Sequence, residues 1–141
     1  MNEIEQIEQT INNYATYADS REAEKQQALF TENAEITVYS PDSEPQTIQG
    51  ADSLLQGFKA LEQYPHTFHL IGQKSINIID SSNATAYVYT VAHHVIDNQD
   101  GSKSLMIMYI RYQDNLIKDN DNWLFEKRIL HIDFIENRPL N

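Results

Sequence analysis

Apolar side chains recur at helical spacing in the first part of the chain. Ile4, Ile7 and Ile11 follow one another at three- and four-residue intervals, which predicts an amphipathic helix with one buried side that ends near Asp19. Residues 19–22 have the pattern of a capping box and predict a second helix, which Asn33 ends. The two helices are expected to form a hairpin.

Residues 34–38 alternate between apolar and polar side chains, as in a strand with one buried face. The next segment, residues 40–46, is polar and contains two prolines, which is typical of a loop. A third helix follows Gly50, carries Leu54 and Phe58 on its apolar side, and ends before Pro65. The sequence therefore predicts three helices before the first long strand.

The spacing of apolar residues changes from a helical to a strand period near His66. Four long segments rich in Ile, Val, Tyr, Phe and Thr are separated by short polar turns, which suit antiparallel hairpins. The predicted strands span residues 66–79, 84–97, 103–117 and 122–135. We therefore expect an α+β fold of one domain, residues 1–141, with the helices on the concave face of a curved antiparallel sheet.

The charge of the chain narrows its expected partners. Ten Lys and Arg residues against 21 Asp and Glu residues give a net charge of −11. Nucleic acids and anionic membranes bind through Lys and Arg, so neither is an expected partner. The absence of cysteine excludes disulfides, thiolate nucleophiles and Cys-ligated metals. No apolar run approaches the roughly 18 residues that span a bilayer, and we expect a soluble cytoplasmic protein.

Three titratable residues could form a proton-transfer site: Asp19, His69 and His94. Histidine changes charge near neutral pH, and a carboxylate bonded to one ring nitrogen makes the other nitrogen a better base. His93 and His94 must point to opposite faces of their strand, so at most one of them enters a pocket. Asp19 has a second interpretation, as the N-cap of the second helix, and His69 could equally be a packed core histidine.

The same residue types could also form a metal site. Two histidines and a carboxylate could hold a metal ion, drawn from His66, His69, His94, His131 and Asp133. His66 and His69 are three residues apart in an expected strand, however, and would face opposite sides, so no metal site is predicted. There is no glycine-rich phosphate loop either, and the prediction includes no cofactor.

The chain resembles the SnoaL-like family of the NTF2-like superfamily over nearly its whole length. The resemblance rests on "YATYADSREAEKQQALFTENAEI", "IQGADSLLQGF", "HLIGQKSINI", "ATAYVYTVAHH" and "YIRYQDN" with "NWLFEKR". It implies an NTF2-like cone, in which three N-terminal helices close one mouth of a strongly curved antiparallel sheet that encloses a pocket. Trp123, Phe125 and Arg128, in the last predicted strand, are interpreted as residues that stabilise the fold.

Within this superfamily the chain is similar to the scytalone dehydratases. The catalytic Asp and the two histidines of that family fall on Asp19, on His69 in "HLIG", and on His94. Two positions depart from the pattern: one tyrosine of the family corresponds to Ala18, and another to Val38 or, with a shift of one residue, Tyr39. The resemblance therefore implies a related acid–base chemistry on a different substrate.

The sequence and the resemblance predict an enzyme that moves a proton next to a carbonyl or hydroxyl group in a compact apolar or aromatic molecule. A dehydration, an isomerisation or a ring closure would fit, so the expected class is a lyase, an isomerase or a cyclase. His94 is expected to be the general base, within about 3 Å of Asp19, with His69 donating a proton or holding a water. Tyr39 is the expected oxyanion donor. The expected pocket wall consists of Tyr14, Tyr39, Phe58, Met106, Met108 and Tyr112.

The alternative is a non-catalytic ligand-binding or dimerisation module, because folds of this kind host both classes. An exposed sheet face that carries Tyr87, Tyr89 and Tyr109 favours a homodimer.

Overall fold

The computed structural model describes all 141 residues. Its helices are α1 (Glu3–Asp19), α2 (Ala23–Gln27) and α3 (Ala51–Lys59), with a 3-10 turn, η1 (Ala60–Gln63), after the third. Its strands are β1 (Phe30–Tyr39), β2 (Gln46–Gln49), β3 (His66–Ile78), β4 (Asn83–Asp97), β5 (Lys103–Asp119) and β6 (Asn122–Leu140). The strands form one sheet in the order β2-β1-β6-β5-β4-β3.

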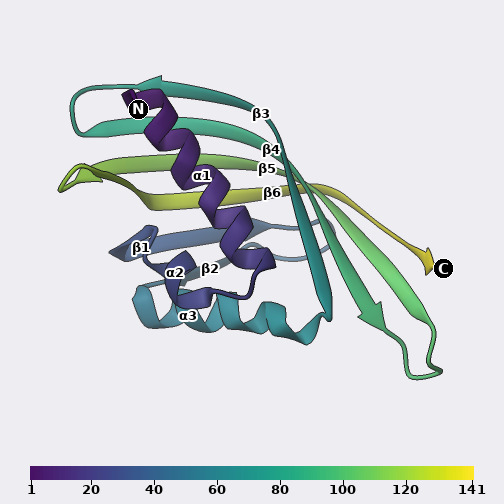
Figure 1. Ribbon diagram of the computed structural model, residues 1–141. Coiled ribbons are helices and arrows are strands. Elements are labelled where there is room, and N and C mark those ends of the chain that lie inside the picture. Colours follow the sequence, from purple (N-terminus) through teal and green to yellow (C-terminus); the bar gives the residue numbers. More distant parts are fainter.

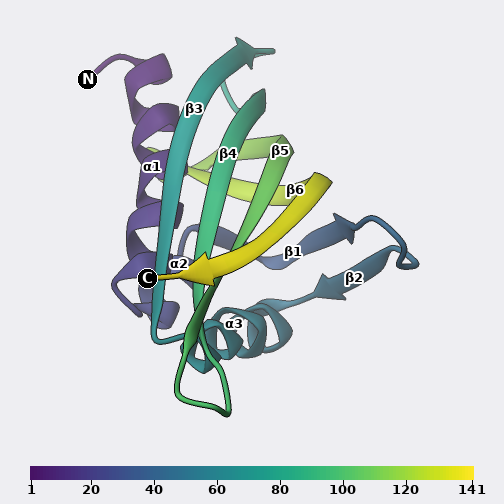
Figure 2. The same ribbon diagram turned by 90° about the vertical axis from the view of Figure 1, so that its right-hand side faces the viewer.

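The four long strands form the antiparallel meander that the sequence predicts, with ends within a few residues of the predicted ones except at β6, which continues to Leu140. They bend sharply about halfway along, and the sheet wraps around α1 (Figures 1 and 2). The prediction of an entirely antiparallel sheet is wrong, because β1 pairs in parallel with β6 and Thr37 lies opposite Ile129. This pairing joins segments about 90 residues apart, which no local pattern reports.

The helices differ from the prediction mainly in the length of the second one. The second helix is short because Phe30 already belongs to β1: Leu29 accepts a hydrogen bond from the backbone N–H of Phe125 at 2.8 Å. The third helix lies after Gly50 and before β3, as predicted, but β1 and β2 precede it, so only two of the three helices are N-terminal to the whole sheet. None of the helices is long and apolar enough to cross a membrane.

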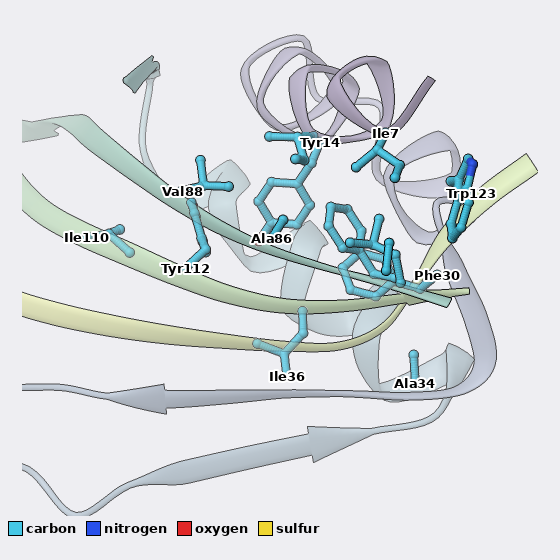
Figure 3. Close-up of a cluster of buried hydrophobic side chains, with 14 of the residues drawn as sticks. Ile7, Tyr14, Phe30, Ala34, Ile36, Ala86, Val88, Ile110, Tyr112 and Trp123 are labelled. Carbon is cyan, nitrogen blue, oxygen red and sulfur yellow. The ribbon is translucent and has the colours of Figure 1, made fainter. Parts of the chain in front are cut away.

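The core lies between α1 and the concave face of the sheet (Figure 3). In β4 every second side chain faces inward, as the alternation predicts; Ala84, Ala86, Val88 and Ala92 are all buried. Aromatic rings fill much of the remaining space, with ring centroids 5.0–6.0 Å apart. These rings belong to Tyr14, Phe30, Phe58, Tyr112 and Phe125. Each fully buried ring of this size contributes roughly 1.5–3 kcal/mol by leaving water.

Candidate functional site

The carboxylate of Asp19 lies at the end of α1 and binds β3. Its Oδ1 is 2.7 Å from Nδ1 of His69 and accepts a hydrogen bond from Thr67 Oγ1 at 2.9 Å. Its Oδ2 accepts a hydrogen bond from the backbone N–H of His69 at 2.8 Å. Thr67 and His69 can reach the same carboxylate because alternate residues of a strand share a face.

The expected pairing of Asp19 with His94 is therefore wrong, since its partner is His69. The reason is the order of the strands: β3 is the strand that α1 packs against, whereas β4 lies one strand farther away. Asp19 does not cap α2 either. The residue at that N-cap is Glu22, and no side chain caps the helix.

Asp19 occupies an unfavourable place for a negative charge, because the C-terminus of a helix carries the negative end of its dipole. No basic residue lies in the last turn of α1 to offset it. Hydrogen bonds to the carboxylate offset this unfavourable placement instead. Arg21, whose backbone φ of 62° lies in the left-handed region, follows the helix and adds further hydrogen bonds. Its guanidinium donates to Thr67 Oγ1 at 3.1 Å and to the carbonyl of Tyr64 at 2.6 Å. A charge in an unfavourable place that neighbouring groups compensate is typical of a functional site.

These contacts determine the protonation of the Asp19–His69 pair. Burial alone would raise the pKa of Asp19, but the hydrogen bonds from His69 and Thr67 outweigh it, and the net shift lowers the pKa. The carboxylate is therefore ionised at neutral pH, and Nδ1 of His69 carries the proton that it accepts. Nε2 of His69 makes no hydrogen bond within the protein, and in the neutral ring it holds a free lone pair.

His94 lies next to His69 on the inner face of the sheet, with its ring centroid 6.2 Å away. It is only 5% exposed, and Nδ1 lies 3.2 Å from the carbonyl oxygen of Met106, its partner on β5. Burial lowers the pKa of His94, although the Met106 carbonyl opposes the shift. At neutral pH the ring is uncharged, donates from Nδ1, and keeps Nε2 as a hydrogen-bond acceptor. The neighbouring His93 points outward, to the carbonyl of Phe68.

His69 and His94 line one apolar cavity of about 160 Å³. Four of the expected wall residues also line it: Tyr14, Phe58, Met108 and Tyr112. The expected placement of Tyr39 is wrong, because it lies at the exposed end of β1 and stacks on the ring of His131, 5.2 Å away. Met106 does not line the cavity either. It contacts the site only through its backbone carbonyl, which accepts the hydrogen bond from Nδ1 of His94.

Ile110, which shares a strand face with Met108 and Tyr112, also lines the cavity. The wall residues that the sequence did not indicate are Ala18, Gln26, Gly57, Leu61, Ala92 and Leu130. Most of these are small or aliphatic and share a face with residues that were identified. Gln26 is different, because it is polar and lies on a helix of five residues, too short to show a period. The alternative grouping of metal ligands is dispersed, and no three His, Asp or Glu side chains lie close enough to hold an ion.

The model of the SnoaL-like domain family matches residues 1–129. A comparison with curated proteins finds no match. Among solved structures, a candidate scytalone dehydratase from Novosphingobium aromaticivorans has a TM-score of 0.84 at 21% identity, over 99% of this chain and 89% of that one.

Two further structures show the same likeness. The hexachlorocyclohexane dehydrochlorinase LinA-type3 from Novosphingobium barchaimii has a TM-score of 0.76 at 12% identity, over 95% and 87% of the two chains. An NTF2-like protein with a cystatin-like fold, from Novosphingobium aromaticivorans, has a TM-score of 0.68 at 20% identity, over 92% and 80%. At such identities these structures show a shared fold.

Proposed function

The chain belongs to the SnoaL-like domain family, and we propose that it is a small-molecule lyase or isomerase in which His69, paired with Asp19, is the general base. The observation that carries this proposal is the 2.7 Å contact between Asp19 Oδ1 and His69 Nδ1. In the neutral ring this contact leaves the lone pair of Nε2 free, and His69 lines an apolar cavity. The roles of the two histidines are therefore exchanged relative to the expectation from sequence.

The proposed reaction begins with the C–H bond beside a carbonyl group. Nε2 of His69 takes the proton, and the ionised Asp19 stabilises the imidazolium that forms. In an elimination the electron pair of that C–H bond forms a C=C bond as the bond to a β-hydroxyl breaks. The departing hydroxide takes the proton from His69 and leaves as water. In an isomerisation His69 returns the proton to another carbon. Positioned acid–base groups of this kind contribute about 10²–10⁴ in rate.

His94 is proposed to orient the substrate. Its Nδ1 proton is donated to Met106, so Nε2 can accept a hydrogen bond from a substrate hydroxyl. The lowered pKa of His94 keeps it uncharged beside the imidazolium that forms on His69. Repulsion between two adjacent cations is thereby avoided.

The size of the cavity supports a compact substrate. A volume of about 160 Å³ is close to that of an engineered protein cavity that binds benzene, roughly 150 Å³. Its aromatic and aliphatic walls suit an uncharged ring. The fold neighbours named as a dehydratase and a dehydrochlorinase are consistent with an elimination, although they share only the fold with this chain.

The test is exchange of the protons beside the carbonyl of single-ring ketones in D₂O, followed by NMR, because exchange needs only the first step. We expect the protein to accelerate exchange, and His69→Gln to lose about 10²–10⁴ of that acceleration. His93→Gln is the matched control, since His93 faces outward. Exchange by His69→Gln at the rate of the unmodified protein would show that His69 is not the base.

A second candidate function, dimerisation through the outer face of the sheet, is favoured by exposed apolar side chains. Phe68, Leu70, Tyr89 and Phe134 are all exposed there, and Phe134 stacks on Tyr109 at 4.3 Å. Light scattering tests a homodimer. We expect Phe134→Lys to give monomers, whereas Ile48→Lys, at an exposed position on β2, leaves the mass unchanged. A monomeric unmodified protein would contradict the proposal.

A further inference from the structure

The side chain of Gln26 is the one carboxamide of the cavity wall. Gln26 is 3% exposed, and both of its backbone groups are hydrogen-bonded: its N–H donates to the carbonyl of Glu22, and its carbonyl accepts from the N–H of Leu29. The side-chain amide has two N–H donors and one acceptor oxygen, and none of them bonds to another group of the protein. A buried amide without partners is unfavourable unless something else bonds to it.

The unpartnered amide of Gln26 opens onto the cavity. The buried side-chain atoms that have neither a partner nor any open space beside them belong to Gln6, Thr90, Asp114 and Arg128. Gln26 is not one of these residues, and it lines the cavity together with His69 and His94. Its free hydrogen-bonding groups therefore face the space that a ligand would occupy.

The other polar groups of the cavity define what the amide is for. In their neutral forms both histidines use their Nδ1 protons within the protein, so each then offers a ligand only an acceptor. No lysine or arginine lines the cavity, and Arg21 is already bonded to Thr67 and Tyr64. The cavity wall thus has no lysine or arginine for a carboxylate or phosphate. Gln26 can supply N–H donors to an uncharged oxygen, and the hydroxyls of Tyr14 and Tyr112 are the other uncharged donors on residues of the wall.

We propose that Gln26 is a specificity-determining residue whose side-chain N–H binds the carbonyl oxygen of an uncharged, single-ring ketone. The inference rests on the proposed function only in taking this cavity as the substrate site. The same N–H group then stabilises the negative charge that develops on that oxygen when His69 removes the neighbouring proton. Asp19 and Gln26 lie on either side of the turn formed by residues 20–22, so one turn positions both the partner of the base and the donor.

The experiment compares two probes of the same shape, cyclohexanone and methylenecyclohexane, of which only the first has an oxygen. Their dissociation constants are measured by NMR titration of the unmodified protein, Gln26→Leu and Gln26→Met. We expect the unmodified protein to prefer the ketone by about 2–10-fold, which corresponds to one net hydrogen bond. Both variants are expected to lose that preference. Gln27→Leu, on the same helix and outside the cavity wall, is the control and should retain it.

Retention of the ketone preference by the Gln26 variants would overturn the inference, as would an unmodified protein that binds both probes equally. Proton exchange of cyclohexanone in the same samples separates this outcome from failure of the proposed function. If His69→Gln exchanges at the unmodified rate while Gln26→Leu has lost its preference, the catalytic proposal fails and the assignment of Gln26 stands. If Gln26→Leu keeps its preference while His69→Gln has lost exchange, the opposite holds.

Discussion

Asp114 and Asp19 each bind a basic side chain, but in very different surroundings. Asp114 pairs with Arg128, and Asp19 pairs with His69. Asp114 and Arg128 have side chains with no exposed area, and Oδ1 lies 2.9 Å from Nε. The guanidinium of Arg128 lies over the rings of Tyr14, Tyr112 and Phe125, 3.6–4.4 Å from their centroids. Asp19 and His69 are 2.7 Å apart, with side chains 26% and 8% exposed.

The comparison shows how surroundings separate a structural pair from a reactive one. Burial raises the pKa of Asp114 to about 6, against the attraction of Arg128, which cannot lose its proton. Asp19 has a lowered pKa because its donors outweigh a partial burial. Tyr14 and Tyr112 form the partition, since they line the cavity and also contact Arg128. Only the pair on the open side of these rings can exchange a proton with a ligand.

The largest effect on stability is expected from breaking the fully buried pair of Asp114 and Arg128. Asp114→Ala leaves the guanidinium of Arg128 buried without a counter-charge, so the free energy of unfolding should fall by about 3–5 kcal/mol in urea denaturation. The double variant Asp114→Leu with Arg128→Met removes both charges and should recover most of that loss. A double variant no more stable than Asp114→Ala would show that the pair is not the source of the effect.

Breaking the partly exposed pair of Asp19 and His69 should affect stability less. Asp19→Ala leaves the backbone N–H of His69 and the hydroxyl of Thr67 without their acceptor, a loss of about 2 kcal/mol in the free energy of unfolding. The same change should remove the downfield ¹H NMR signal of a proton on Nδ1 of His69 that is bound to a carboxylate. His93→Ala serves as the control. A loss as large as that of Asp114→Ala would mean that both pairs are structural.

The two pairs also mark where sequence reasoning succeeds and where it ends. Local periodicity predicted α1 and the four long strands, and it placed His93 and His94 on opposite faces of β4. The family resemblance selected His94, which is the buried one of the two. Neither identified the histidine that meets Asp19, because that depends on the order of strands beside α1. The Asp114–Arg128 pair joins two strands whose register includes a bulge, so alternation alone does not identify it.

Thr67 is hydrogen-bonded to the pair of Asp19 and His69 but does not titrate, so it separates hydrogen bonding from charge. Thr67→Val removes the hydroxyl that donates to Asp19 and accepts from Arg21, and it keeps the shape of the side chain. We expect a loss of about 1 kcal/mol in the free energy of unfolding. Thr67→Ser retains the hydroxyl and should lose less. Equal losses in the two variants would mean that packing of the methyl group, and not the hydrogen bond, is responsible.

The smallest effect is expected in the dependence of stability on pH, and His94 reports it. The pKa of folded His94 is lowered from its ordinary value of about 6.5, so below that pH the unfolded chain binds more protons than the folded one. The contribution of His94 to stability should therefore fall as the pH decreases from 7.5 to 5.5.

The raised pKa of Asp114 acts in the opposite direction as the pH falls through about 6, because there the folded chain binds more protons. The difference between the unmodified protein and His94→Gln isolates the histidine from this effect. We expect His94→Gln to lose less stability over the same interval in urea denaturation. Equal losses would mean that folding does not lower the pKa of His94. The ring would then gain a proton near its ordinary pKa of about 6.5, and the charged form could not accept a hydrogen bond from a ligand.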